Sequence, residues 1–181
     1  MRLFIGIPLA EQTVNELSAI SLRYRSADDG LRWSLPQSWH VTLQFLGSVS
    51  EQQYACVIPQ LRALNHRAVA IEIGSTDFFE RAGIFFAQVR PTPELLSLQQ
   101  QVTSATAHCG FSAESRPYHP HITLARAKGS RDSIGLRKLK ATIRRQPTFS
   151  GFISQEFLLY ESHLASSGSQ YEVRARFPLA Q

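Results

Sequence analysis

Hydrophobic and polar positions along this chain follow two different periods. Short runs that are apolar or that alternate apolar with polar residues predict strands over residues 2–9, 39–46, 68–73, 77–80, 84–90, 119–126, 152–161 and 171–177. Apolar side chains that recur every three to four residues predict helices over residues 11–24, 51–64, 95–109 and, within a basic segment, 132–144. The order of these elements favours an α+β fold with antiparallel sheets over a wound parallel sheet.

Two local signals refine the second of these helices. Ser50 followed by Gln53 resembles a capping box, which opens a helix by satisfying its first backbone N–H groups. Pro59 lies inside the same apolar pattern, and we expect it to kink or shorten the helix because it lacks an N–H.

A four-residue pattern occurs twice, as His40-Val41-Thr42-Leu43 and as His121-Ile122-Thr123-Leu124. Residues i and i+2 of a strand project from one face, so each His should share a face with its Thr. Strict alternation would turn Phe45 toward the core, unless the strand twists near its end. The repeat predicts two related lobes within a single domain, residues 1–181, whose polar faces meet across a cleft.

Two histidines and two threonines in one cleft suit phosphoryl chemistry. Imidazole titrates near neutral pH, so one His can activate a water while the other protonates the departing oxygen of an in-line displacement. The hydroxyls of Thr42 and Thr123 can donate to phosphate oxygens as negative charge builds. Arg126, three residues after Thr123, can add a fixed positive charge.

The amino-acid composition narrows the class of protein in which this chemistry would take place. The 181 residues are 43% hydrophobic and 18% charged, which is globular composition, and no apolar run approaches the length of a membrane helix. We read the N-terminal stretch as a strand rather than a signal peptide. Two cysteines, Cys56 and Cys109, cannot make a disulfide framework, and we expect them to be reduced in a cytoplasmic protein.

The net charge of +5 lies wholly in the second half of the chain. Residues 1–90 hold eight basic and eight acidic side chains, whereas residues 91–181 hold eleven and six. The excess is concentrated in residues 116–145, including the basic segment 126–145. It is either a solvated face or a surface that attracts a polyanion such as RNA, and charge alone does not decide.

The same residues carry a family resemblance. The chain resembles the 2H phosphoesterase superfamily, named for two H-x-T-x motifs, and more narrowly the bacterial RNA 2′,3′-cyclic phosphodiesterases, also called 2′-5′ RNA ligases. The matching stretches are residues 2–7, 40–47, 116–126 and 157–162, with Tyr171. The resemblance implies a bilobal fold of two antiparallel sheets flanking a central cleft, with helices outside.

The resemblance also implies an activity and residue roles. The family opens a terminal 2′,3′-cyclic phosphate on RNA to a 2′-phosphomonoester, with no cofactor and no metal, and in reverse can form a 2′-5′ bond. By position, His40 would be the proton donor and His121 the proton acceptor. Thr42 and Thr123 would hold phosphate oxygens, Phe45 would contact the terminal base, and Arg126 would bind phosphate.

Two other interpretations compete with this one. The chain could be a nucleotide- or RNA-binding module of the same fold with weak or no turnover. A metalloprotein is the other, because His40, His119 and His121 offer three imidazoles for zinc, although no carboxylate or Cys flanks either motif. We expect a monomer that does not bind membranes, since no apolar surface stripe stands out.

Overall fold

Two four-stranded antiparallel sheets form the body of the molecule in a computed structural model. The structure describes residues 1–27, 29–129, 134–143, 146–165 and 168–180. The first sheet has the order β10-β9-β1-β3 and the second the order β2-β7-β6-β5. Strands β4 and β8 pair separately. The predicted α+β class with antiparallel sheets is confirmed.

The strands are β1 (Arg2–Pro8), β2 (Leu31–Trp33), β3 (His40–Ser48), β4 (Val69–Ile71), β5 (Ile73–Phe79), β6 (Ile84–Val89), β7 (His121–Ala127), β8 (Phe152–Ser154), β9 (Glu156–Ala165) and β10 (Gly168–Pro178). The helices are α1 (Glu11–Tyr24), α2 (Glu51–Arg62), α3 (Pro93–Ala107) and α4 (Ile134–Thr142). The short 3₁₀ turns η1 (Pro36–Ser38) and η2 (Glu80–Ala82) precede β3 and β6.

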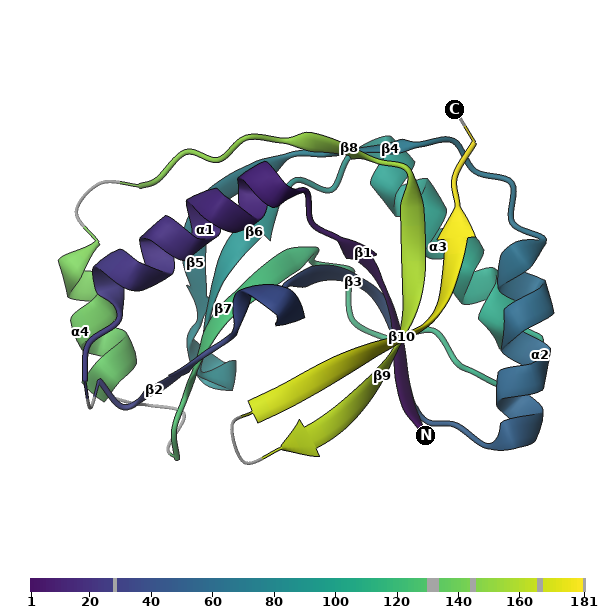
Figure 1. Ribbon diagram of the computed structural model, residues 1–181, viewed down its shortest axis with the longest axis horizontal. Coiled ribbons are helices and arrows are strands. Elements are labelled where there is room, and N and C mark those ends of the chain that lie inside the picture. The colour runs from purple at the N-terminus through teal and green to yellow at the C-terminus, as the bar shows by residue number, and fades with distance from the viewer. Residues whose placement is uncertain (28, 130–133, 144–145, 166–167, 181) are drawn as a thin grey trace.

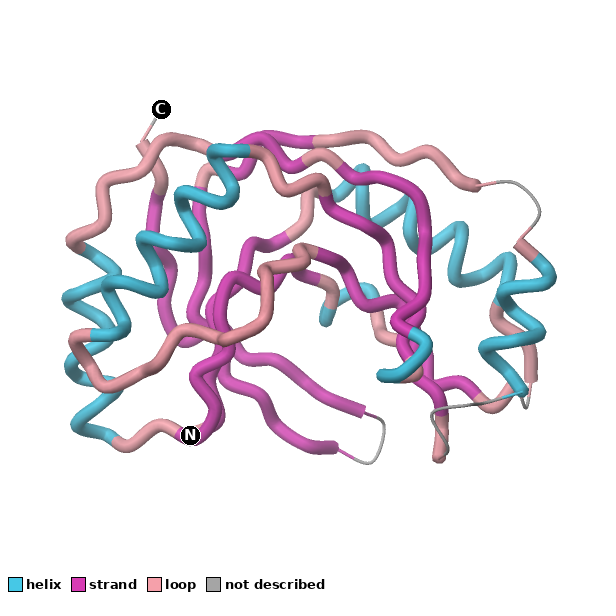
Figure 2. The backbone as a smooth tube through the Cα atoms, turned by 180° about the vertical axis from the view of Figure 1, so that it is seen from behind, coloured by secondary structure: helices cyan, strands magenta, loops and turns pink. Residues whose placement is uncertain are grey.

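The helices lie on the outside of the strands. Figure 1 shows α2 and α3 at one end of the molecule and α1 and α4 toward the other, with β1 and β3 crossing between them. The view from behind in Figure 2 shows the same arrangement, with strands in the middle and helices at the flanks. Buried side chains of both sheets form one continuous apolar cluster, so the two halves share a core.

Local signals in the sequence correspond to the observed helix ends. The Ser50 side chain accepts from the Gln53 backbone, and the Gln53 side chain accepts from the Ser50 backbone, so the predicted capping box is present. α2 continues past Pro59 and ends at Arg62, one turn later. The basic helix predicted over 132–144 is α4, although Asp132 and Arg144 lie outside the described residues.

Two expectations about the chain path are wrong. The stretch 152–161 is not one strand, because β8 pairs with β4 while β9 joins the first sheet beside β1. The sequence pattern also misses the short strand β2, because three residues are too few to show a period. None of the helices in the described parts of the chain is long and apolar enough to cross a membrane.

The expectation of reduced cysteines is also wrong. Cys56 on α2 and Cys109, just beyond α3, form a disulfide with a Cα–Cα distance of 5.8 Å. The two helices pack side by side, which brings together residues 53 positions apart. That packing depends on the tertiary fold and leaves no trace in the spacing of two cysteines.

Candidate active site

His40 and His121 each occupy the first position of a strand, β3 and β7. In each case the ring Nδ1 lies against the carbonyl oxygen two residues upstream: Ser38 at 2.8 Å for His40, and His119 at 2.7 Å for His121. A carbonyl only accepts hydrogen bonds, so each Nδ1 carries the proton and donates it. In their neutral form both rings therefore leave Nε2 unprotonated.

A β-bulge in each strand brings a further side chain to the histidine face. Leu43 is an extra residue between the positions opposite Ile5 and Gly6 in β1. Leu124 is likewise extra between the positions opposite Phe85 and Phe86 in β6. Each bulge reverses the alternation that follows it.

The consequence concerns the residue five positions after each histidine. Phe45 is 58% exposed on the cleft side, so the expectation that it would turn into the core by strict alternation is wrong. Arg126 occupies the equivalent place after His121 and is also exposed toward the cleft. The repeated motif thus presents an aromatic ring from one lobe and a guanidinium from the other.

The six residues singled out from the sequence all line one cavity of about 1120 Å³ between the two sheets. They are His40, Thr42, Phe45, His121, Thr123 and Arg126. The Thr42 hydroxyl lies 3.0 Å from His40 Nε2, and it donates to that nitrogen because the ring proton is on Nδ1.

Three aromatic side chains pack around the ring of His40. Its ring centroid lies 4.6 Å from that of Phe4, 5.3 Å from Tyr171 and 5.8 Å from Tyr160. Gly6 leaves room for it, since a Cβ there would lie 3.2 Å from His40 Cδ2. Packing of this kind fixes the ring position and removes water from one side of it.

This burial sets the protonation of both histidines. It lowers the pKa of His40 to about 4, against the opposing effect of the Ser38 carbonyl, and the charges of His121 and Arg126 lower it further. Burial also lowers the pKa of His121, the His119 carbonyl opposes the shift, and Arg126 adds to it. In the free protein at neutral pH both rings are therefore uncharged.

Three cavity residues had no role in the interpretation of the sequence. Tyr118 donates from its hydroxyl to the Thr42 carbonyl oxygen at 2.8 Å, which ties the loop before β7 to β3, and burial raises the pKa of this phenol. Tyr171 of β10 and Arg32 of β2 also line the cavity. Tyr118 and Tyr171 belong to the stretches that carry the resemblance but had no role there, whereas Arg32 has only its place in the fold to mark it.

Comparison with known proteins identifies the family of this chain. The family model of the 2′-5′ RNA ligase superfamily matches residues 9–163. The chain belongs to this superfamily. The match includes both His-x-Thr strands, so the bulged strands of the cleft lie inside the region that defines the family.

Individual members of the superfamily match nearly the whole chain. An RNA 2′,3′-cyclic phosphodiesterase of Bacillus subtilis is 27% identical, and the match covers 98% of this chain and 96% of that protein. The one from Geobacillus stearothermophilus is 28% identical over 97% of this chain, which spans only 56% of that longer protein. The crystal structure of Escherichia coli LigT without ligand superposes with a TM-score of 0.83 at 25% identity, covering 99% of this chain and 98% of LigT.

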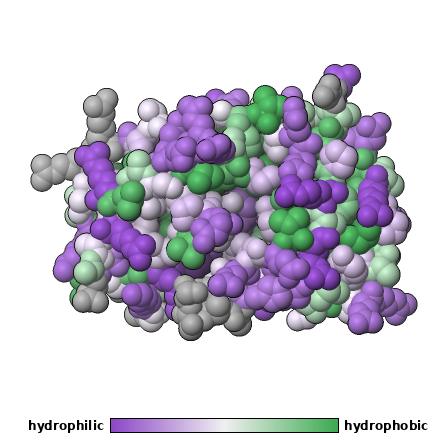
Figure 3. Space-filling model, viewed as in Figure 1, coloured by the Kyte–Doolittle hydropathy of each residue, from purple (hydrophilic) through white to green (hydrophobic). Residues whose placement is uncertain are grey.

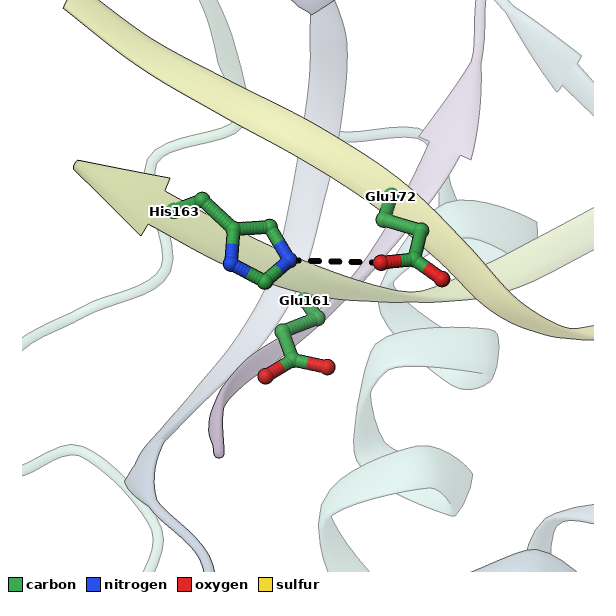
Figure 4. Close-up of side chains that lie close together, drawn as sticks. All are labelled: Glu161, His163 and Glu172. Carbon is green, nitrogen blue, oxygen red and sulfur yellow. Dashed lines mark hydrogen bonds and ion pairs between the residues drawn. The ribbon is translucent and has the colours of Figure 1, made fainter. Parts of the chain in front are cut away.

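In the part of the chain that the structure describes, His40, His119 and His121 do not form a group whose ligand atoms all lie within 4.8 Å of one another. Within the described ranges, the one group of three metal-capable side chains is Glu161, His163 and Glu172, on the β9–β10 hairpin shown in Figure 4. Arg174 forms ion pairs with both of these carboxylates, at 3.6 Å and 3.2 Å. A metal ion bound there would have to displace the guanidinium of Arg174 from both carboxylates.

Proposed function

We propose that this chain is an RNA 2′,3′-cyclic phosphodiesterase that opens a terminal cyclic phosphate to a 2′-phosphomonoester by metal-independent acid–base catalysis. The observation that carries the proposal is the pair of carbonyl-held histidines, His40 and His121, that present Nε2 to one cavity beside Thr42 and Thr123. Curated relatives with this name match almost the full chain. The same ring opening, with an RNA 5′-hydroxyl in place of water as the nucleophile, would break the bond between phosphorus and O3′ and form a 2′-5′ bond.

In the hydrolytic direction, the Nε2 of neutral His121 accepts a proton from water as the water oxygen attacks phosphorus. The bond between phosphorus and O3′ breaks, and protonated His40 gives its Nε2 proton to the departing oxygen. The product keeps the phosphate on O2′. Each histidine must then exchange one proton with solvent, in opposite directions, before the next turnover.

His40 must gain a proton before it can act as the donor. Burial opposes that charge in the free protein, but a phosphate anion bound beside the ring supplies negative charge and raises the pKa again. Protonation also reverses the hydrogen bond to Thr42, because Nε2 then donates and the hydroxyl accepts. The Thr42 proton becomes free to donate to a phosphate oxygen in the same state in which His40 is a competent acid.

The bulged positions orient the substrate around this centre. The exposed ring of Phe45 offers a surface on which the terminal base can stack. Arg126, whose charge acts on both histidines, can pair with the reacting phosphate. Neither contact reads the identity of a base, so this part of the site suits RNA ends of varied sequence.

The decisive experiment uses a purified oligoribonucleotide that ends in a 2′,3′-cyclic phosphate and measures release of the 2′-phosphate. His40→Ala and His121→Ala should each lower kcat by about 10²–10⁴-fold. His66→Ala is the matched control, because that ring also contacts a backbone carbonyl but lies outside the cavity. Activity should survive EDTA.

A wild-type rate as low as that of His121→Ala would end the enzyme proposal. Tight binding of the same oligonucleotide without turnover would then favour the RNA-binding module. Loss of activity in EDTA, restored by a divalent cation, would instead overturn the metal-independent mechanism.

We further propose that residues 1–181 act as one domain of two related lobes, as a monomer of the cytoplasm, although disulfides such as Cys56–Cys109 are rare in that compartment. The shared apolar core supports a single unit. Hydrophilic side chains cover most of the face in Figure 3, and the hydrophobic spots on it are separate and small. Light scattering after size exclusion tests the oligomeric state, and a dimer mass would refute it.

A further inference from the structure

Two arginines face each other across neighbouring strands at the rim of the cleft. The register of β2 with β7 places Arg32 directly opposite Arg126. Leu31 and Trp33, on either side of Arg32, are buried, so Arg32 points to the cleft face, and both arginines line the cavity. Opposite residues of an antiparallel pair have Cβ atoms about 5 Å apart, where like charges are destabilising.

The acidic side chains that the structure describes form no ion pair with either of these two arginines. The nearby Asp29 accepts from the Trp33 indole at 2.7 Å and from the Leu31 backbone at 2.8 Å.

The two carboxylates that line the cavity are already engaged. Glu80 is paired with Lys140, and Glu114 lies 3.7 Å from Arg116. Arg81 adds another guanidinium to the same lining. Counting only the residues that the structure describes, this end of the cleft therefore holds uncompensated positive charge on a sheet, an arrangement that a bound anion would stabilise.

The order of the strands places Arg126 on the same strand as His121 and Arg32 on the neighbouring strand, so the two guanidiniums can have different roles. Arg126 is on β7, the strand of His121, and its charge lowers the pKa of both histidines, so it lies beside the reacting phosphate. Arg32 is on β2, the edge strand of that sheet, one strand farther from His121. Neighbouring strands are about 4.8 Å apart, so an anion held by Arg32 is displaced from the reacting centre by a further strand.

We propose that Arg32 binds the first internucleotide phosphodiester on the 5′ side of the cyclic phosphate, while Arg126 pairs with the reacting phosphate itself. This assignment rests on the proposed function and specifies its substrate class. A cyclic mononucleotide has no such phosphate, so the Arg32 site favours oligonucleotide ends over 2′,3′-cyclic mononucleotides.

The test compares uridine 2′,3′-cyclic phosphate with the dinucleotide UpU that ends in a 2′,3′-cyclic phosphate. Wild-type kcat/KM should be higher for the dinucleotide, and Arg32→Gln should lower that value about ten- to a hundredfold while leaving the mononucleotide value unchanged. Arg32→Lys should keep part of the advantage, since charge remains but the bidentate fork is lost. Arg62→Gln, which removes the same charge from α2 outside the cavity, should change neither value.

The salt dependence provides a second readout. Arg32→Gln should reduce the slope of log affinity against log salt by about 0.7 for the dinucleotide product, the value for one phosphate contact on a single strand. The mononucleotide product, uridine 2′-phosphate, should show an unchanged slope.

Three results would overturn the assignment. Equal losses of kcat/KM on both substrates would mean that Arg32 acts at the reacting phosphate or supports the fold. No loss on either substrate would mean that Arg32 does not bind the substrate. An effect limited to ligation with a 5′-hydroxyl strand would assign the arginine to that strand instead, which also refutes the proposal. If the wild type cleaves neither substrate, the proposed function fails, and the affinities of the two products for wild type and Arg32→Gln still decide the role of Arg32.

Discussion

The ring of His40, half-buried among aromatic side chains, makes folding stability depend on pH in a predictable way. Burial lowers its pKa from 6.5 to about 4, and a tenfold change in a proton-binding constant corresponds to about 1.4 kcal/mol. Protonating His40 in the folded state therefore costs about 3 kcal/mol more than in the unfolded chain. Because the unfolded chain binds this proton first, the contribution is complete above pH 6.5 and is lost as the pH falls toward 4.

The perturbation is His40→Gln, which retains hydrogen-bonding capacity but cannot titrate. The free energy of unfolding of wild type and variant is measured in urea at intervals from pH 7.5 to pH 4. Acidification weakens both proteins, because His121 and other groups titrate in both. The difference between them should change by about 3 kcal/mol across this window, with wild type losing more.

Parallel stability curves for the two proteins would refute the reasoning. An NMR titration gives an independent measure, because it should place the pKa of His40 near 4 in the free protein. Bound uridine 2′-phosphate should raise that pKa. A value of 6.5 in the free protein would show that the aromatic surroundings do not exclude water from the ring.

Three shorter predictions concern catalysis and the tertiary framework. The kcat/KM profile should be bell-shaped and centred on the acid side of pH 6.5, because burial lowers both histidine pKa values, and a flat profile from about pH 5 to 9 would contradict paired acid–base histidines. Cys56→Ser opens a cross-link that spans 53 residues and should lower the free energy of unfolding by about 4 kcal/mol. Thiol titration checks that the wild-type pair is oxidised, and an unchanged urea midpoint would count against a structural role of the disulfide. Gly6→Ala places a Cβ 3.0 Å from the Val41 carbonyl oxygen and 3.2 Å from the His40 ring, so kcat should fall at least about tenfold with little change in KM, and wild-type kcat would show that the ring has room to move.

Local patterns in the sequence were enough to locate the chemistry. The two His-x-Thr repeats placed His40 and His121 on strands, and the 3.6-residue period located the helices. The capping box at Ser50 was readable because all of its groups lie within four residues. Features of this kind depend on neighbours along the chain, so periodicity and residue type determine them.

The interactions that complete the cleft depend on register, which no single segment encodes. Whether Phe45 faces the core or the cleft follows from a bulge at Leu43, and that bulge exists only because β3 pairs with β1. Arg32 faces Arg126 only because a three-residue strand adds to the edge of the second sheet.

The sequence by itself determined an α+β chain with two histidine–threonine strands and an excess of positive charge in its second half. The tertiary structure decided which side chains share the cleft, that burial leaves both histidines neutral, and that two cysteines 53 residues apart are joined. The physical reason is the separation along the chain of the residues that interact. Strand and helix periods arise from contacts a few residues apart, whereas side-chain burial, strand register and helix packing arise from contacts between distant parts of the chain.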